Sequence, residues 1–362
     1  MTQAAKYPLK ESLQSPPIDH DCDVDEAWVK DKTIVITGGA SGLGSSFLRK
    51  WAATGATVII GDINVDKGDQ LVRDTKKETS NSNLYFFYCD VTKWHSQVQF
   101  FKDAVNASPH GGIDTVVANA GILDPANEFE SPGDLNVAEP PPPNLAVLDV
   151  NLTGVLYTTH LTLFHLSRNP DSFPASTEAP RSSRDRHLLL LSSMAGVLPL
   201  PGNTLYATSK HAIVGLFRSL RTTAFAHGIR VNMLCPYFVD TPLIITPGRL
   251  LLAGGTLGRP EDVTEAGTRF VANPYVLRRA VVVGPKLKVK QDSSGEWKLV
   301  EASDESGDHR AIWEAYADDF EDNELFTRNY VRLLNGLVEI RGWIGWLSDL
   351  FAVLKYGMGW SR

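Results

Sequence analysis

Thr37-Gly-Gly-Ala-Ser-Gly-Leu-Gly44 follows the apolar run Lys32-Thr-Ile-Val-Ile-Thr37 and opens a helix-length segment that ends at Thr54. Glycines in such a loop let the backbone turn tightly, approach a phosphate closely and pack the next helix onto a sheet. The amino end of that helix presents unpaired N–H groups and the positive end of the helix dipole. The stretch therefore predicts a strand, a phosphate-binding turn and a helix. A plain strand-to-helix turn is the alternative interpretation.

Six further apolar runs of strand length follow along the chain. They occupy residues 57–61, 84–89, 113–118, 187–192, 230–234 and 279–283, and helix-length segments separate them. Apolar strands that alternate with helices indicate crossover connections and a parallel sheet covered on both faces. The sequence thus predicts an α/β fold with a doubly wound, parallel, seven-stranded sheet of the Rossmann type.

The pattern divides the chain into three regions. Residues 1–30 form a polar amino-terminal extension, residues 31–285 the Rossmann catalytic domain, and residues 286–362 a carboxyl-terminal extension. In that last region, residues 286–302 alternate like a β-hairpin around Ser293-Ser-Gly295, and residues 309–360 are predicted to be helical. Two surface insertions interrupt the domain, at 124–144 with four consecutive prolines and at 167–186.

Composition excludes several classes of protein. The 362 residues carry a net charge of −7, which argues against a nucleic-acid partner. Cys22, Cys89 and Cys235 are too few and too widely spaced for a disulfide framework or a zinc site, so we expect no metal and a reducing, cytoplasmic location. The amino terminus lacks the apolar core of a secretory signal, and no uncharged apolar run approaches the ~18 residues of a membrane span.

Two local patterns suggest chemistry. Asp62 ends the second apolar run, where a carboxylate can accept hydrogen bonds from ribose hydroxyls and repel a 2′-phosphate. Tyr206 and Lys210 stand four residues apart, so that on a helix they share one face. An ammonium beside a phenol favours the phenolate and brings its pKa towards the working pH. A solvated carboxylate and an exposed surface pair are the respective alternatives.

Further motifs give these patterns a family context. Asp90-Val91 and Asn119-Ala-Gly121 each follow an apolar run, and Asn151 lies in Asp149-Val-Asn-Leu-Thr-Gly-Val155. Ser193 stands thirteen residues before Tyr206, and Pro236-Tyr-Phe-Val-Asp-Thr241 follows the sixth run. With the spacing TGxxxGxG and YxxxK, this set resembles the short-chain dehydrogenase/reductase family over about residues 30–285. The details are closest to fungal members akin to 15-hydroxyprostaglandin dehydrogenase.

The resemblance implies a role for each matched residue. The catalytic set would be Asn151, which holds a relay water, Ser193, which orients the substrate oxygen, Tyr206, which transfers the proton, and Lys210. Ser192 competes with Ser193, but its spacing to Tyr206 is one residue too long. The residues implied in cofactor binding are Thr37, Gly38, Ser41, Gly42, Leu43, Gly44, Asp62, Asp90, Val91, Asn119, Ala120, Gly121, Tyr206, Lys210, Pro236, Val239 and Thr241.

The family pattern also bears on the choice of cofactor and on one loop. Family members that use NADP usually carry a basic residue at the positions of Ser41 or Ile63, so NAD is favoured here over NADP. Tyr237 replaces the glycine that usually follows Pro236, and a tyrosine cannot take a glycine-only conformation without strain. That substitution leaves the local shape of this loop open.

The sequence therefore predicts an NAD-dependent oxidoreductase that interconverts a secondary alcohol and a ketone on a lipophilic small molecule, in secondary metabolism. An NADP(H)-dependent carbonyl reductase and a non-catalytic, nucleotide-binding scaffold protein are the alternatives. Family members usually pair through the helices after the fourth and fifth strands, which predicts a homodimer. The apolar face of residues 337–354 is expected to dock on protein, with a membrane surface as the alternative.

Overall fold

The computed structural model describes residues 14–18, 24–123, 128–131, 133–176, 182–243, 256–301 and 307–315, together with positions 329, 330, 332, 333, 336 and 340. The chain separates into two units. One unit comprises Gln14–Ala317, and the other comprises Met1–Leu13 with Asp318–Arg362. The six described positions of the smaller unit are helical.

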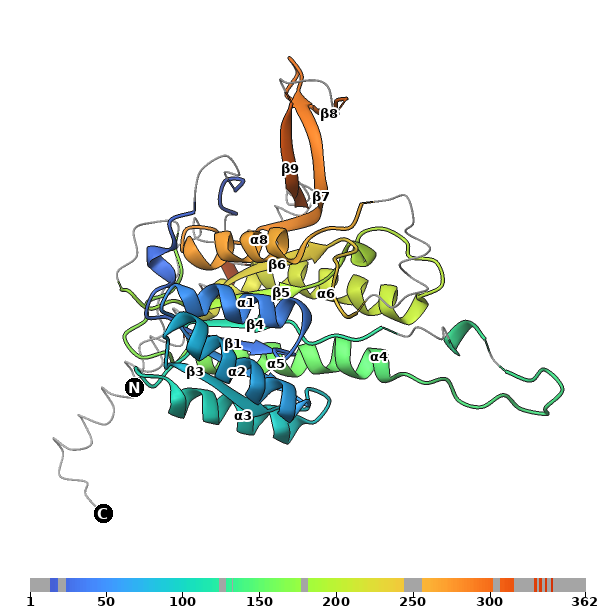
Figure 1. Ribbon diagram of the computed structural model, residues 1–362, viewed down its shortest axis with the longest axis horizontal. Helices are drawn as coiled ribbons and strands as arrows, with labels where there is room; N and C mark the ends of the chain where they lie inside the picture. Colours follow the sequence, from blue (N-terminus) through green and yellow to red (C-terminus); the bar gives the residue numbers. More distant parts are fainter. Residues whose placement is uncertain are drawn as a thin grey trace. The chain divides into compact units, whose positions relative to one another are not determined.

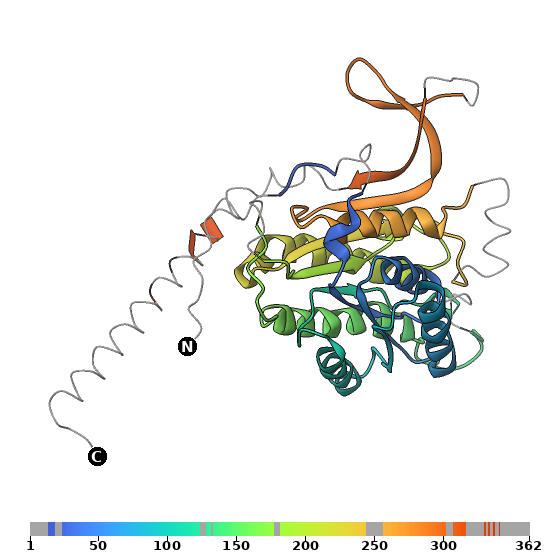
Figure 2. The same cartoon turned by 60° about the vertical axis from the view of Figure 1, so that its left-hand side comes forward.

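The larger unit is built on one sheet with helices on both sides (Figures 1 and 2). Its strands are β1 (Thr33–Thr37), β2 (Thr57–Asp62), β3 (Leu84–Tyr88), β4 (Thr115–Ala118), β5 (His187–Leu191), β6 (Arg230–Pro236), β7 (Ala280–Gln291), β8 (Trp297–Leu299) and β9 (Asp308–Ala315). Strands β1 to β7 are parallel and lie in the order β3-β2-β1-β4-β5-β6-β7. These seven parallel strands confirm the predicted doubly wound arrangement, and β8 and β9 extend the sheet to nine strands by antiparallel pairing with β7.

The helices form one layer on each face of the sheet. They are α1 (Gly42–Ala53), α2 (Val65–Thr79), α3 (Trp94–Ala107), α4 (Ala146–Leu148), the π-helix η4 (Asp149–Gly154), α5 (Val155–Leu166), α6 (Thr204–Thr223) and α8 (Pro260–Ala272). Short 3₁₀ turns are η2 (Glu26–Val29), η3 (Glu128–Glu130), η5 (Met194–Gly196) and η6 (Ala224–His227). Helices α1, α2 and α8 share one apolar core, whereas α3, α5 and α6 share the other.

The alternation of side chains along β1 shows how the two cores arise. Ile34 and Ile36 point into the core beneath α1, and Val35 points into the core beneath α3 and α5. All three side chains are fully buried, as expected for a central strand of a covered parallel sheet. Because every strand from β1 to β6 ends at the same edge, the loops after these strands converge on one site.

The carboxyl-terminal extension begins as predicted and then departs from the prediction. The hairpin is confirmed, since Gln291 pairs with Trp297 and Val289 with Leu299 across an Asp292–Glu296 turn. However, β7 is one continuous strand across position 285, where the sequence placed a domain boundary. That boundary and the one at residue 30 stay sequence-based assignments.

The helix predicted from residue 309 is wrong for the part that the structure describes there. Residues Asp308–Ala315 form β9, which pairs antiparallel with β7. An open edge strand exposes a row of unpaired N–H and C=O groups, and β9 satisfies that row on β7. Its Ala311 and Ile312 become buried in the process. The local sequence pattern, which suggested a helix, contains no information about this pairing with a distant strand.

The termini of the larger unit meet beside β7. The main-chain N–H of Ser15 donates to the carbonyl of Leu277 at 3.2 Å, and that of Ile18 donates to Glu314 at 2.8 Å. The predicted amphipathic segment 337–354 lies outside the described residues except for Ile340, whose side chain is exposed. No helix among the described residues is long and apolar enough to cross a membrane.

Candidate active site

The glycine loop between β1 and α1 folds tightly upon itself. Gly38 and Gly42 have φ angles of +65° and +53°, a conformation that residues with side chains rarely adopt. A Cβ on Gly38 would lie 2.6 Å from the Cα of Ala120, and one on Gly44 would lie 2.4 Å from the Gly38 carbonyl oxygen. Both positions therefore require glycine. Leu43, beside them, is half-buried and packs against the core.

Asn119 and Thr37 join the ends of β4 and β1. The Asn119 amide donates to the carbonyl oxygens of Thr37 and Gly38, at 3.0 and 2.9 Å. In return the Thr37 hydroxyl accepts from the main-chain N–H groups of Asn119 and Ala120, at 3.2 and 3.3 Å. The segment Asn119-Ala-Gly121 is thus fixed against the glycine loop. The two sequence motifs therefore lie side by side in the folded chain.

The two carboxylates at the ends of β2 and β3 differ in what they hold. Asp62 accepts from the main-chain N–H of Ala40 in the glycine loop and from that of Asn64, each at 3.0 Å. Asp90 instead accepts from the N–H and hydroxyl of Thr92 within its own turn, at 2.9 and 2.7 Å. Asp62 therefore contacts the glycine loop, whereas the Asp90 carboxylate forms its hydrogen bonds within its own turn.

The loops after β5 and β6 meet at Ser193. Its hydroxyl lies 3.3 Å from the Pro236 carbonyl oxygen, to which it donates, and accepts from the Ala195 N–H at 3.1 Å. The neighbouring Ser192 is buried and donates to the carbonyl of Lys210 at 2.9 Å, which is a structural contact. Ser193 is thus the serine that faces the site.

The loop after β6 accommodates Tyr237 without backbone strain. Tyr237 is not among the described non-glycine residues with positive φ, and its N–H donates to Val283 at 2.8 Å. Val239 is buried and forms an isolated parallel bridge with Gly258. Thr241 then stands opposite the glycine loop, since a Cβ on Gly42 would lie 3.9 Å from its Cβ.

Tyr206 and Lys210 lie on one face of α6 and are both buried. The Lys210 ammonium lies 5.6 Å from the centre of the Tyr206 ring and donates to the carbonyl of Leu191 at 3.1 Å. The Tyr206 phenol also forms a hydrogen bond with the Ser193 hydroxyl. The phenol, the ammonium and the Ser193 hydroxyl are therefore one contiguous group.

The acidity of the phenol differs from the simple expectation. Burial raises the pKa of Tyr206 above its ordinary value, and the hydrogen bond with Ser193 only partly opposes this. Burial also lowers the pKa of Lys210 to about 8, because the charged form is the costly one there. The Lys210 ammonium donates a hydrogen bond to the Leu191 carbonyl and lies 5.6 Å from the centre of the Tyr206 ring. The four-residue spacing of Tyr206 and Lys210 therefore did not predict that burial would dominate the pKa of the phenol.

Asn151 lies in the π-helix η4 and is completely buried. Its amide donates to the Ile122 carbonyl at 2.9 Å and to the Ser209 hydroxyl at 3.3 Å, while its oxygen accepts the Ile122 N–H at 2.8 Å. A Cβ on Gly121 would lie 3.4 Å from the Asn151 oxygen and 3.6 Å from the Lys210 ammonium. Asn151 thus fixes the loop that adjoins Lys210.

Comparison with known proteins identifies the family of this site. Residues 32–246, more than half of the chain, match the family model of short chain dehydrogenases. This chain is a short-chain dehydrogenase. The match covers β1 to β6 and their loops, and it confirms the family resemblance and the assignment as an oxidoreductase enzyme.

Curated relatives share the core of this short-chain dehydrogenase. It is 34% identical over 290 residues to 5′-hydroxyaverantin dehydrogenase of Dothistroma septosporum, covering 76% of this chain and 92% of that protein. It is 30% identical to the NADP-dependent dehydrogenase clz5 of Cochliobolus lunatus, with 71% and 90% covered. It is 27% identical to mouse 15-hydroxyprostaglandin dehydrogenase [NAD(+)], with 60% and 70% covered.

A solved structure shares the fold. The 3-ketoacyl-(acyl-carrier-protein) reductase of Brucella melitensis, complexed with NADH, superposes with a TM-score of 0.56 at 23% identity. The likeness covers 70% of this chain and 97% of that chain. At this level of identity it shows the common Rossmann architecture, which agrees with the strand order described above.

The site of this short-chain dehydrogenase has features that fit a nicotinamide dinucleotide, the cofactor type of its family. Ser41 precedes α1 but its side chain makes no capping hydrogen bond, so the helix start keeps N–H groups for a pyrophosphate. Gly42 and Thr241 bring the glycine loop and the loop after β6 close together, since a Cβ on Gly42 would lie at van der Waals distance from Thr241. The buried ammonium of Lys210 lies next to Gly121, 3.6 Å from where a Cβ on that glycine would stand. These residues suit a long ligand with an anionic centre.

Two buried residues that the sequence motifs did not indicate, Gln97 and Ser209, support the segment that carries Asn151. Gln97 on α3 is fully buried, and its amide donates to the carbonyls of Val91 and Gly154 at 2.7 and 2.8 Å. It thus joins the end of β3 to η4, which carries Asn151. Ser209 contacts Asn151 in the same way from α6. The sequence did contain a signal for Gln97, because it is a polar residue on the face of α3 that otherwise carries the buried apolar side chains.

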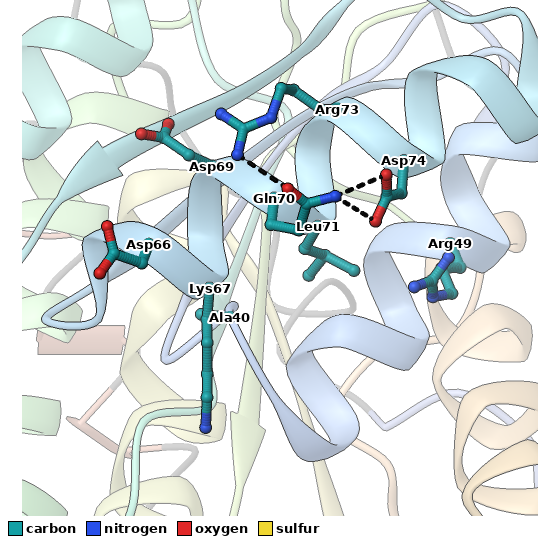
Figure 3. Close-up of a pocket in the computed structure, with 9 residues that line it drawn as sticks. All are labelled: Ala40, Arg49, Asp66, Lys67, Asp69, Gln70, Leu71, Arg73 and Asp74. Atoms are coloured by element: carbon teal, nitrogen blue, oxygen red, sulfur yellow. Dashed lines mark hydrogen bonds between the residues drawn. The ribbon is translucent and has the colours of Figure 1, made fainter.

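A groove of ≈ 590 Å³ lies over α1 and α2, outside the catalytic group (Figure 3). Arg49, Lys67 and Arg73 line it together with acidic residues of α2, and Ala40 brings it to the glycine loop. It adjoins the Asp62 end of the site rather than Tyr206. Among the described residues, no cluster of histidine, cysteine or acidic side chains could hold a metal ion.

Proposed function

We propose that this chain is an NAD-dependent dehydrogenase that interconverts a secondary alcohol and a ketone on a lipophilic small molecule. The observation that carries the proposal is the contiguous group of Ser193, Tyr206 and Lys210 opposite the glycine loop. A phenol that can exchange a proton, a hydroxyl beside it and a buried cation are what alcohol–ketone chemistry requires of the protein.

Each residue has a distinct task in this proposal. The Ser193 hydroxyl orients the substrate oxygen. The Tyr206 phenolate takes the proton from an alcohol during oxidation, and the neutral phenol returns it to a ketone during reduction. Lys210 binds the ribose hydroxyls of the cofactor and offsets the negative charge that develops on the phenol when it loses its proton. The bound nicotinamide supplies the hydride acceptor or donor. Because Tyr206 is buried, its charged form needs this cation nearby.

Asp62 supports NAD as the cofactor. Both carboxylate oxygens are held by main-chain N–H groups, of Ala40 and Asn64, so the carboxylate stays at the loop. A fixed negative charge there accepts ribose hydroxyls and repels a 2′-phosphate. The mouse relative is named as an NAD(+) enzyme, which agrees with this choice.

An NADP(H)-dependent carbonyl reductase is the second candidate, because one cation adjoins the same loop. Lys67, on the first turn of α2, lines the groove beside Ala40 (Figure 3). The relative from Cochliobolus lunatus is named as NADP-dependent. Titration of the native protein with NADH and NADPH separates the two candidates, and tighter binding of NADPH overturns the NAD proposal. Asp62→Ala should narrow the difference in affinity between NADH and NADPH. Glu261→Ala, which removes an exposed acid of α8 outside the groove, should not.

The apolar surroundings of the phenol support a lipophilic substrate. Tyr206 belongs to a small cluster with Val147, Ala195 and Leu205, and Leu123, Leu148 and Leu200 pack against it. A role in secondary metabolism is supported by the names of the fungal relatives. A cytoplasmic location agrees with Cys89 and Cys235, which are free thiols.

The decisive experiment is a spectrophotometric screen of NAD⁺ reduction with a panel of hydrophobic secondary alcohols. Tyr206→Phe should keep dinucleotide affinity and lose turnover, because it removes only the proton-transfer group. A protein that binds NADH but turns over no alcohol or ketone would be the non-catalytic scaffold instead. Turnover that survives in Tyr206→Phe would show that another group carries the proton.

We also propose a homodimer formed through α5 and α6. Two large apolar side chains of α6, Ile213 and Phe217, are fully buried in the core of their own subunit and are not available to a partner. The outer face instead offers Leu156 and Phe164 on α5, which are 43% and 50% exposed. Gly215 on α6 faces open space, which lets a partner helix approach closely. An exposed apolar face of this kind favours association.

A further inference from the structure

The insertion at 124–144, which the family chemistry does not use, contacts the catalytic helix. In Figure 1 its described residues form the green loop beside α4. The Glu130 carboxylate accepts a hydrogen bond from the hydroxyl of Thr204, the first residue of α6 and two positions before Tyr206. The turn η3, which contains Glu130, packs on α6. The insertion is therefore attached next to the proton-transfer group.

The amino end of α6 is suited to this attachment. Its N-cap residue Asn203 makes no capping hydrogen bond, and its first turn contains no acidic residue. A twenty-residue helix has a partial positive charge at this end, which a carboxylate stabilises. Glu130 supplies from a distant segment the negative group that α6 lacks locally. The contact thus has an electrostatic reason beyond a single hydrogen bond.

The ends of the insertion complete an apolar wall beside Tyr206. Leu123 directly precedes it, and Val147 and Leu148 of α4 follow it closely, and all three belong to the cluster around the phenol. Helix α4 also packs on α6. Further apolar side chains near these ends remain exposed: Ile122 by 37%, Phe129 by 45% and Leu145 by 43%. The insertion therefore offers apolar area next to the reacting group that the protein itself does not cover.

We propose that the described part of the insertion, residues 128–131 and 133–144, forms a substrate-selecting arm, held on α6 by Glu130 and Thr204, which favours bulky lipophilic alcohols over small ones. This inference rests on the proposed alcohol–ketone activity. The carbinol end of such a substrate reaches Ser193 and Tyr206, and its apolar body covers the exposed side chains of the arm. A small alcohol touches only the catalytic group and gains nothing from the arm. Glu130 and Thr204 are positioning residues in this scheme.

The test compares the oxidation of cyclohexanol with that of the two-ring alcohol 1-tetralol. Glu130→Ala and Thr204→Val each release the arm, so kcat/KM for 1-tetralol should fall about fivefold, mainly through KM. For cyclohexanol it should change by less than about twofold. Glu139→Ala, an exposed acid in the same arm, and Thr208→Val, an exposed threonine on the same helix, are the matched controls and should behave as wild type.

The outcomes separate the arm from the activity on which it rests. An equal loss for both alcohols, or no loss for either, overturns the arm while leaving the proposed function intact. Equal values of kcat/KM for the two alcohols in the wild type also overturn the arm and leave the proposed function intact. A wild type that oxidises neither alcohol with NAD⁺ or NADP⁺ overturns both proposals. Melting temperatures near that of the wild type show that the variants fold.

Discussion

Replacement of Asn151 by alanine tests how the site is held together. The side chain of Asn151 bridges the main-chain donor and acceptor of Ile122, at 2.8 and 2.9 Å, and contacts Ser209. Gly121, the neighbour of Ile122, adjoins the Lys210 ammonium. The variant therefore releases the loop that lies between η4 and Lys210, without removing any group that the proposal assigns to proton transfer.

The expected loss of stability follows from the groups left unpaired. A buried donor or acceptor without a partner costs ~1–3 kcal/mol, and Ile122, which is 37% exposed, lets water recover part of that. Two such groups give about 2 kcal/mol in the free energy of unfolding, or a melting temperature lower by about 3 °C for a chain of this size. Displacement of Gly121 by about 1 Å should lower kcat about 100-fold.

The assay needs a variant that loses similar contacts elsewhere. Asn232 is also fully buried, donates to the Val276 carbonyl at 3.0 Å and accepts the Arg279 N–H at 2.9 Å. Asn232→Ala should destabilise the fold comparably, by urea denaturation, and yet keep kcat. If Asn151→Ala loses no more activity than Asn232→Ala, or melts within about 1 °C of wild type, the reasoning about this loop is refuted.

Three further predictions concern charge and assembly. Burial lowers the pKa of His110, His165 and His187 below the ordinary value of 6.5, so the unfolded chain binds more protons than the folded one near that pH. The free energy of unfolding should therefore fall as the pH drops through 6.5. Urea titrations at several pH values that show no such fall contradict this prediction. Affinity for NADH should weaken above pH 8 as Lys210 loses its charge, and fluorescence titration of Lys210→Ala should lack that change. Phe164→Glu should yield monomers by light scattering; a monomeric wild type would refute the dimer.

The sequence by itself determined the sheet and the order of the motifs. Glycines at positions 38, 42 and 44 and short β-branched runs are local signals, and each strand from β1 to β7 lies where its apolar run predicted it. The positions of Ser193, Tyr206 and Lys210 followed in the same way, because a strand end and a helix period fix them. These features depend on neighbours within about one turn of chain.

Other features depended on contacts between distant segments, and only the tertiary structure decided them. Strand β9 forms because β7 presents an open edge. The side-chain amide of Asn151 forms hydrogen bonds with the main chain of Ile122, 29 residues away. The pKa of Tyr206 rises because several elements bury the phenol, which outweighs the hydrogen bond with Ser193. The bond between Glu130 and Thr204 spans 74 residues. Burial and long-range pairing are properties of the packed chain, and no local period encodes them.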